Sequence, residues 1–169
     1  AAIASSCSMS GKAKAESGRK AQQDFERLFY DGHDGNAALK TLDAWMEKDD
    51  RNPELYIDYF NYYLSADAKP SVALDSEPGT KGPSLVISDP ETNETIGYIH
   101  DTTAYNPESV RQALHYLNQG LRYSGNRLDM YFGKIHVLND IKDYSTASST
   151  IVEVLSLSRK TFTTPSFGV

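Results

Sequence analysis

Few residue patterns in this chain suit catalysis or metal binding. Four histidines are scattered through it, and no two have the spacing of zinc ligands on one helix: His33, His100, His115 and His136. No G-x-S-x-G motif marks a nucleophilic serine, and Lys81 in the segment TKGPS has the wrong glycine spacing for a phosphate-binding loop. We therefore expect a protein that is not an enzyme and has no cofactor and no metal site.

An aromatic cluster is the strongest candidate for a binding site. Five rings fall within one short predicted helix: Tyr56, Tyr59, Phe60, Tyr62 and Tyr63. The same helix carries acidic residues, including Asp58, but no Lys or Arg. Rings that stack and hydroxyls that hydrogen-bond suit an acidic groove for a peptide or a sugar, with Tyr56, Asp58, Tyr59 and Tyr63 as predicted contacts. The alternative is that the rings pack against neighbouring helices and a β-hairpin.

Helical periodicity defines the elements that would position this cluster. Apolar residues recur with a helical period over about 19–30, 37–50, 53–64 and 107–123, and twice within 126–157 on either side of a polar turn. Asn36, Asn52 and Asn106 are predicted N-caps, and the last two precede a proline that suits the first helical position. Gly32 suits the left-handed position that follows a helix.

The helical period stops between residues 66 and 105. Residues 67–83 hold three prolines and two glycines and are predicted to be a loop. The segments 84–88 and 95–99 are short β-type runs separated by polar residues, which predicts a β-hairpin. Because an isolated hairpin is marginally stable in water, we expect it to lie against the helices.

The segment from Asn126 to Leu157 resembles a tetratricopeptide repeat. Gly133 stands where that family has a small residue at the closest helix crossing, and Asp143-Tyr144-Ser145-Thr146-Ala147 matches its G/D-x-Y-x-x-A turn. The likeness covers about residues 36–65 and 107–158. It implies a mainly α fold of antiparallel helical hairpins, interrupted here by one inserted β-hairpin. In that family the first helix of each hairpin lines a concave groove that binds a partner.

The first 18 residues are expected to be a signal-peptide remnant and a disordered tether. In AAIASSC, a small residue, Ser6, precedes Cys7, and this resembles the cleavage site of a bacterial lipoprotein, where the cysteine is lipidated. Ala4 stands where that family usually has Leu. Two alternatives stay open: Ala2-Ile3-Ala4 can be an ordinary cleavage site, or Cys7 can be incidental in a disordered terminus.

Composition restricts the function classes further. The chain has 169 residues, enough for one domain, which we place at 19–158 with the insertion at 66–105. The net charge of −6 argues against a nucleic-acid partner. No apolar run approaches the roughly 20 residues that span a bilayer, so membrane contact is expected through a lipid anchor alone. Residues 159–169 lack periodicity and are expected to be an irregular tail, cut short.

These patterns together predict a non-enzymatic protein–protein interaction module. The resemblances imply a tetratricopeptide-like lipoprotein scaffold of a bacterial cell envelope, in the outer membrane or facing the periplasm, that binds a peptide or protein segment in its concave groove. Without lipidation of Cys7, the protein is expected to be secreted or soluble. The alternative function is that of a fragment of a glycan-binding, nutrient-uptake lipoprotein of the outer membrane.

Overall fold

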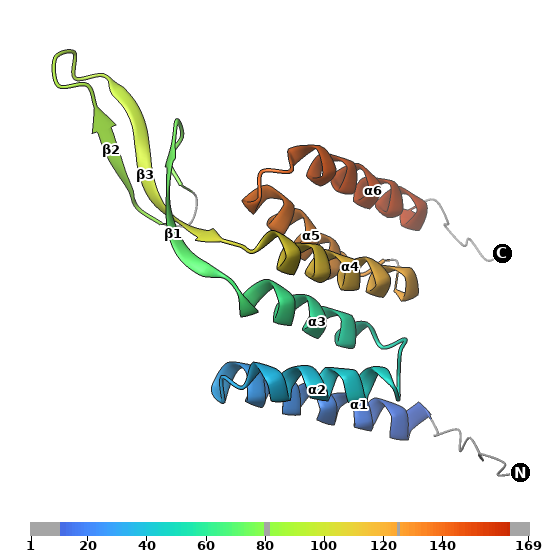
Figure 1. The fold of residues 1–169 in the computed structure, drawn as a ribbon. Helices are drawn as coiled ribbons and strands as arrows, with labels where there is room; N and C mark the ends of the chain where they lie inside the picture. The colour runs from blue at the N-terminus through green and yellow to red at the C-terminus, as the bar shows by residue number, and fades with distance from the viewer. Residues whose placement is uncertain (1–10, 80–81, 125, 163–169) are drawn as a thin grey trace, which may run out of the picture.

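The structure is a computed structural model, and it describes residues 11–79, 82–124 and 126–162 (Figure 1). These residues form six α-helices, one π-helical turn and three strands, in the order α1 (Gly11–Glu26), η1 (Arg27–Asp31), α2 (Gly35–Met46), α3 (Pro53–Ala66), β1 (Lys69–Asp75), β2 (Ser84–Ser88), β3 (Thr95–Ala104), α4 (Pro107–Tyr123), α5 (Leu128–Asp140) and α6 (Tyr144–Phe162). The fold is mainly α with an inserted antiparallel sheet, which confirms the predicted fold class.

The helices pack as successive pairs. Helix α1 packs on α2, α3 on α4, and α5 on α6, while contacts of α2 with α3 and of α4 with α5 join one pair to the next. Figure 1 shows the helices stacked from α1 and α2 at one end to α6 at the other, with the strands leaving the middle of the stack between α3 and α4. The sheet thus replaces the short turn that would otherwise connect these two helices.

Two asparagines begin the helices of the middle pair, as predicted. The Asn52 side-chain oxygen accepts a hydrogen bond from the Glu54 backbone N–H at 3.1 Å, and that of Asn106 accepts one from Glu108 at 2.9 Å. Each bond satisfies a donor that the first helical turn leaves without a partner. Short-range chemistry therefore fixes where α3 and α4 begin.

The turn between α1 and α2 differs from the prediction in two details. The cap of α2 is Asp34, whose side chain accepts from the Ala37 backbone N–H at 3.0 Å, whereas the predicted cap Asn36 lies inside the helix. The left-handed residue is His33, with φ of 50°, whereas Gly32 has φ of −85°. The π-helical turn η1 lengthens the end of the first helical segment, so the left-handed residue that follows it is His33, one residue later than predicted.

Both hydrophobic clusters of the core meet on α3. One cluster lies between α1, α2 and α3 and contains Phe25, Ala38, Leu42, Trp45, Leu55 and Tyr59. The other lies between α3, α4 and α5 and contains Tyr56, Phe60, Val110, Ala113, Leu117, Met130 and Val137. Because α3 is buried on both sides, its aromatic residues hold the stack of helices together.

The closest approach between helices is at Gly120 of α4. A Cβ atom on Gly120 would lie 2.6 Å from the Cβ of Tyr56 and would also overlap the methyl group of Met130. The predicted site of close approach, Gly133, is looser, because a Cβ there would meet the ring of Phe60 at 3.5 Å, an ordinary contact. The prediction was therefore wrong about which glycine is sterically required.

The sheet has the strand order β1-β3-β2, with both pairs antiparallel. The hairpin of β2 and β3 was predicted, but β1 is a strand within the segment predicted as a loop. Pro70 is compatible with it because β1 is an edge strand, and Val72 and Leu74 alternate with less exposed neighbours. The three strands form an arm that projects beyond the helices (Figure 1), so the prediction that the hairpin lies against them was wrong.

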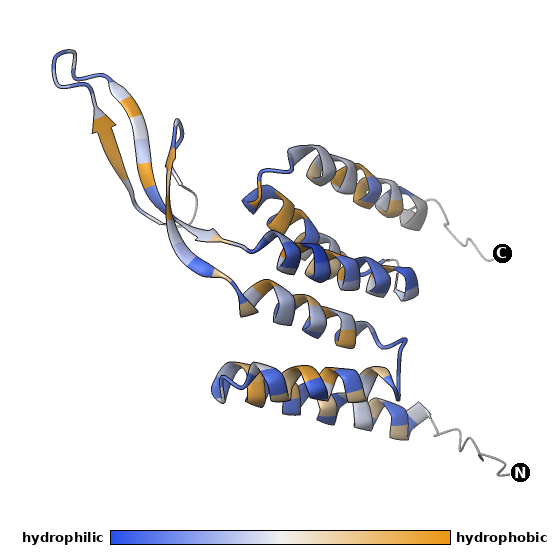
Figure 2. Ribbon diagram, in the orientation of Figure 1, coloured by the Kyte–Doolittle hydropathy of each residue, from blue (hydrophilic) through white to orange (hydrophobic). Residues whose placement is uncertain are grey.

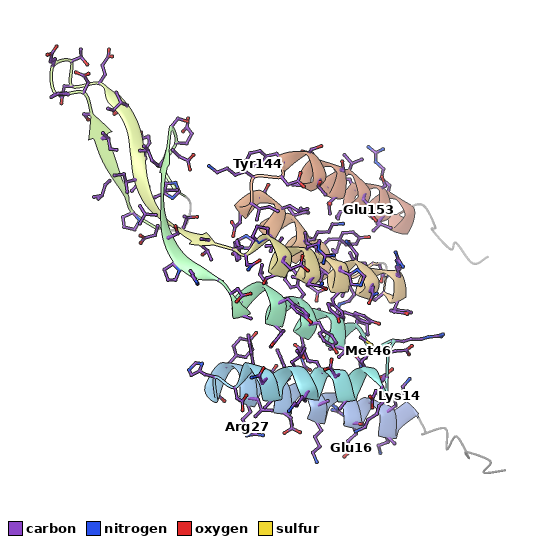
Figure 3. All side chains as sticks on the ribbon, in the orientation of Figure 1. Lys14, Glu16, Arg27, Met46, Tyr144 and Glu153 are labelled. Carbon is purple, nitrogen blue, oxygen red and sulfur yellow. The ribbon has the colours of Figure 1, made fainter. Side chains whose placement is uncertain are left out.

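Both ends of the helical region extend beyond their predicted limits. Residues 11–18 belong to α1 instead of a disordered tether, because Gly18 packs on Trp45 and the Lys14 ammonium lies 2.8 Å from the Asp49 carboxylate (Figure 3 labels Lys14). Helix α6 reaches Phe162, past the predicted start of the irregular tail at 159. Cys7 lies outside the described residues. In the described part of the chain, each helix is too short or too polar to cross a membrane.

Candidate functional site

The structure places the predicted tyrosines mainly in the core. Tyr56 and Tyr59 are each 2% exposed, and Tyr63 is half-buried. The Tyr59 ring lies parallel to that of Tyr116 on α4, with centroids 4.2 Å apart, and its hydroxyl donates to the Asp43 carboxylate at 2.7 Å. The packing alternative therefore holds for Tyr56 and Tyr59. Their assignment to a partner-binding groove is corrected, because a partner cannot reach rings held between helices.

Asp58, the acidic residue of the predicted groove, is also buried. Its side chain is part of a residue only 4% exposed, and its Oδ2 atom has no hydrogen-bond partner among the described residues. Burial, and after it the nearby carboxylates of Glu26 and Glu54, together raise the pKa of Asp58 to about 7, because each disfavours the negatively charged form. Asp58 is therefore a buried, pH-sensitive position inside the helical stack. The prediction that it contacts a partner at the surface was wrong.

The projecting arm of β1, β2 and β3 has several exposed apolar side chains. In the strand register, Leu74 of β1 and Leu85 of β2 both lie opposite Ile99 of β3, so the three side chains form a row on one face. Val72 and Ile87 extend the same face. Exposed fractions are 64% for Val72, 67% for Leu74 and 71% for Leu85. We call these five residues the outward face, and Figure 2 shows the hydrophobic colouring of β1 and β2.

The opposite face of the sheet mixes polar residues with Ala73, Tyr98 and Val86, and its polar groups fasten the arm to the helices. His100 Nε2 lies 3.3 Å from Asp75 Oδ2, and the Lys142 ammonium, from the turn between α5 and α6, lies 2.9 Å from Asp75 Oδ1. Lys142 and His100 hold the pKa of Asp75 below its ordinary value, because both favour the ionised carboxylate. Beside these groups is a cavity of about 350 Å³ that Tyr144 also lines. The polar face therefore turns toward the body, which leaves the apolar face turned away.

The histidine of this face is engaged by structural contacts. Ser84 lies opposite His100 in the register, so Asp75, His100 and Ser84 share one face of the sheet. However, one ring nitrogen of His100 contacts Asp75 and the other the Asp101 carbonyl at 3.2 Å, and Ser84 Oγ accepts from the Gly79 backbone N–H at 2.9 Å. Neither nitrogen is directed at the serine hydroxyl, so this arrangement secures the loop before β2 and does not activate Ser84.

Sequence reasoning missed the outward face for an identifiable reason. The alternation of Val72 and Leu74 within SVALD was a signal for a strand, but the prolines on either side outweighed it. Figure 3 shows side chains of the arm extending into open space, with no helix beside the distal half. Only the three-dimensional arrangement shows that an apolar row has no covering layer among the described residues.

Comparison with known proteins finds no match: no family model, no curated protein and no solved structure matches this chain.

Proposed function

We propose that this chain is a non-enzymatic module that binds another protein or a peptide through the outward face of its arm. The proposal keeps the interaction role expected from the sequence and moves the binding surface from the tyrosine groove to the sheet. The helical stack then acts as a rigid mount, and the triad of Asp75, His100 and Lys142 sets the direction in which the arm points.

The observation that supports the proposal is that no helix covers the apolar row of Leu74, Ile99 and Leu85. A sheet that is apolar on one face is stable in water when another layer covers that face. Here the helices meet the polar face instead, so the covering layer has to come from another molecule or from residues outside the described parts. Large exposed apolar patches on folded proteins are typical of interaction sites.

Anchoring in a bacterial cell envelope is part of the proposal. Cys7, four residues before α1, would hold the module at a membrane through its lipid, with the arm leaving the middle of the helical stack. A tetratricopeptide-like helical scaffold in such a place would present the arm to envelope proteins. The alternative, a fragment of a glycan-binding, nutrient-uptake lipoprotein, came from the likeness to helical-repeat proteins of the outer membrane, and the buried rings of Tyr56 and Tyr59 offer no stacking surface for a sugar.

The test uses a variant without the arm. Residues 69–104 are replaced by a short Gly-Ser linker, which joins the end of α3 to the start of α4. Photo-crosslinking from position 74 in the full-length protein, in its own cells, identifies the partner, and the purified pair is then measured by calorimetry. We expect the armless variant to keep its helical circular dichroism and to lose binding at least tenfold.

A matched control separates the face from the arm as a whole. Leu74→Ser and Leu85→Ser together change the outward face, whereas Thr102→Ser changes the polar face of the same sheet. We expect the first pair to weaken binding and the control to leave it unchanged. Equal binding by the wild type and a folded armless variant would refute the proposed surface.

A further inference from the structure

The edge of the arm offers a second kind of contact, distinct from its outward face. Strand β2 has β3 as its one neighbour among the described strands, so the other edge of β2 presents backbone N–H and C=O groups without strand partners. Figure 1 shows this edge on the side of the arm away from the helices. The edge is therefore open to pairing with another strand.

Strand β2 lacks the charged side chains and prolines that usually protect such an edge. Its residues are Ser84, Leu85, Val86, Ile87 and Ser88, with no charge and no proline. The other edge strand, β1, contains Lys69, Pro70 and Asp75. Because charged residues and prolines on an edge oppose pairing with another chain, β2 is the strand that the fold leaves available.

The sequence of β2 is symmetric about its central residue. Read in either direction it runs serine, large aliphatic, valine, large aliphatic, serine. We infer that β2 pairs with β2 of a second copy of this chain, antiparallel, with Val86 at the two-fold axis. Leu85 then lies opposite Ile87 of the second copy, Ser84 opposite Ser88, and Val86 opposite itself.

This register fits both the charges and the faces of the sheet. The nearest acidic residue, Asp89, would align with Pro83 of the second copy, so no carboxylates oppose one another across the pair. A two-fold axis normal to the sheet keeps each face on its own side, so Leu85 and the second copy's Ile87 meet on the outward face. Aliphatic cross-strand pairs of this kind stabilise by about 0.2–1 kcal/mol each.

The resulting dimer has one six-stranded sheet, with the two helical stacks at its far ends. The two outward faces become one continuous apolar surface of twice the area. The inference goes beyond the proposed function, because it uses the edge of β2 and leaves the outward face for a partner. The dimer would present that partner with two equivalent sites.

The size of the contact sets its strength. Five residues a side is well below the roughly 20–30 of a stable interface, and a register shift between Ile87 and Ser88 shortens the regular part. We therefore expect a weak, reversible dimer, with a Kd between about 1 µM and about 1 mM, so that it forms as the concentration rises through this range.

Paired charge variants test the two-fold position directly. Val86 is 58% exposed, so Val86→Lys and Val86→Glu should both fold, which circular dichroism checks. In sedimentation equilibrium over the same concentrations, each variant alone should be monomeric, because two like charges meet at the axis. An equimolar mixture of the two should dimerise again, because Lys then meets Glu.

The control is Leu74→Lys, which places the same charge on the outward face of the opposite edge strand and should leave dimerisation intact. A wild type that stays monomeric to about 1 mM would overturn the inference, and so would a dimer that Leu74→Lys disrupts or a mixture that fails to recover. A strand of another protein found on β2 in place of a second copy would also overturn it. These outcomes are separate from the partner measurement on the armless variant, because the sedimentation experiments contain no partner and use proteins that keep the arm.

Discussion

Leu85 of β2 and Ile99 of β3 lie directly opposite each other in the antiparallel register, on the face of the sheet that turns away from the helices. Leu74 completes the row from the other side of β3. The sheet thus reverses the usual arrangement, in which the apolar face packs on the core and the polar face meets water. The polar face here carries Asp75, whose contact with Lys142 attaches the arm to the helical body.

One substitution made at two sites tests whether the outward face contributes to folding. Val72→Thr should change the free energy of unfolding by less than about 0.5 kcal/mol, because Val72 is exposed and threonine suits a strand. Val110→Thr, in the core of α4, should lower it by about 1–3 kcal/mol, because the added hydroxyl is buried. Urea unfolding measures both. Equal losses would mean that the outward face is covered in the folded protein.

Two glycine substitutions test the packing of the helices. Gly120→Ala should lower the free energy of unfolding by about 1–3 kcal/mol, because its Cβ would overlap Tyr56 and Met130. Gly133→Ala should raise it by up to about 1 kcal/mol, because alanine favours the helix and only an ordinary contact with Phe60 results. Thermal unfolding of the two variants side by side gives the signs. Stabilisation by Gly120→Ala would contradict the close approach of α4 to α3.

Truncation of Tyr59 tests the correction of the predicted groove. Tyr59→Ala should lower the free energy of unfolding by about 3–5 kcal/mol, because a fully buried ring is removed. Tyr59→Phe keeps the ring and loses only the hydrogen bond to Asp43, so the cost should be about 1 kcal/mol. Urea unfolding compares them. A folded Tyr59→Ala protein of wild-type stability would return Tyr59 to the binding surface.

The buried carboxyl of Asp58 should make stability depend on pH. Its pKa is about 7 in the folded protein and close to its ordinary value of 3.8 when unfolded, so the folded state holds more protons between these values. The stabilisation from the neutral carboxyl is therefore complete below about pH 4 and lost as the pH rises through 7. The slope is at most about 1.4 kcal/mol per pH unit.

Asp58→Asn isolates this contribution from those of other acids. The variant should lack the decline between pH 4 and pH 7 and should be more stable than the wild type at pH 8, because a neutral amide replaces a buried charge. Chemical unfolding at several pH values measures the difference between the two proteins. Parallel pH profiles would show that Asp58 is ionised, or solvated, in the folded state.

The success of the helix predictions follows from the short range of the interactions involved. A cap such as Asn52 or Asn106 acts on backbone groups two or three residues away, so the pattern is visible in a short segment. The strands of the hairpin were visible for the same reason. The cap and the left-handed residue before α2 were misplaced because η1 changes the helical period there.

The sequence by itself determined the helical segments, the interruption after α3 and the hairpin of β2 and β3. Only the tertiary structure decided which apolar residues are buried. Tyr59 is buried because Tyr116, far along the chain, lies against it. Leu74 is exposed because the helices do not cover the face of the sheet that it shares with Ile99. Alternating or helical spacing shows that residues share a face. Burial depends on which distant segment covers that face, and local spacing does not determine which segment that is.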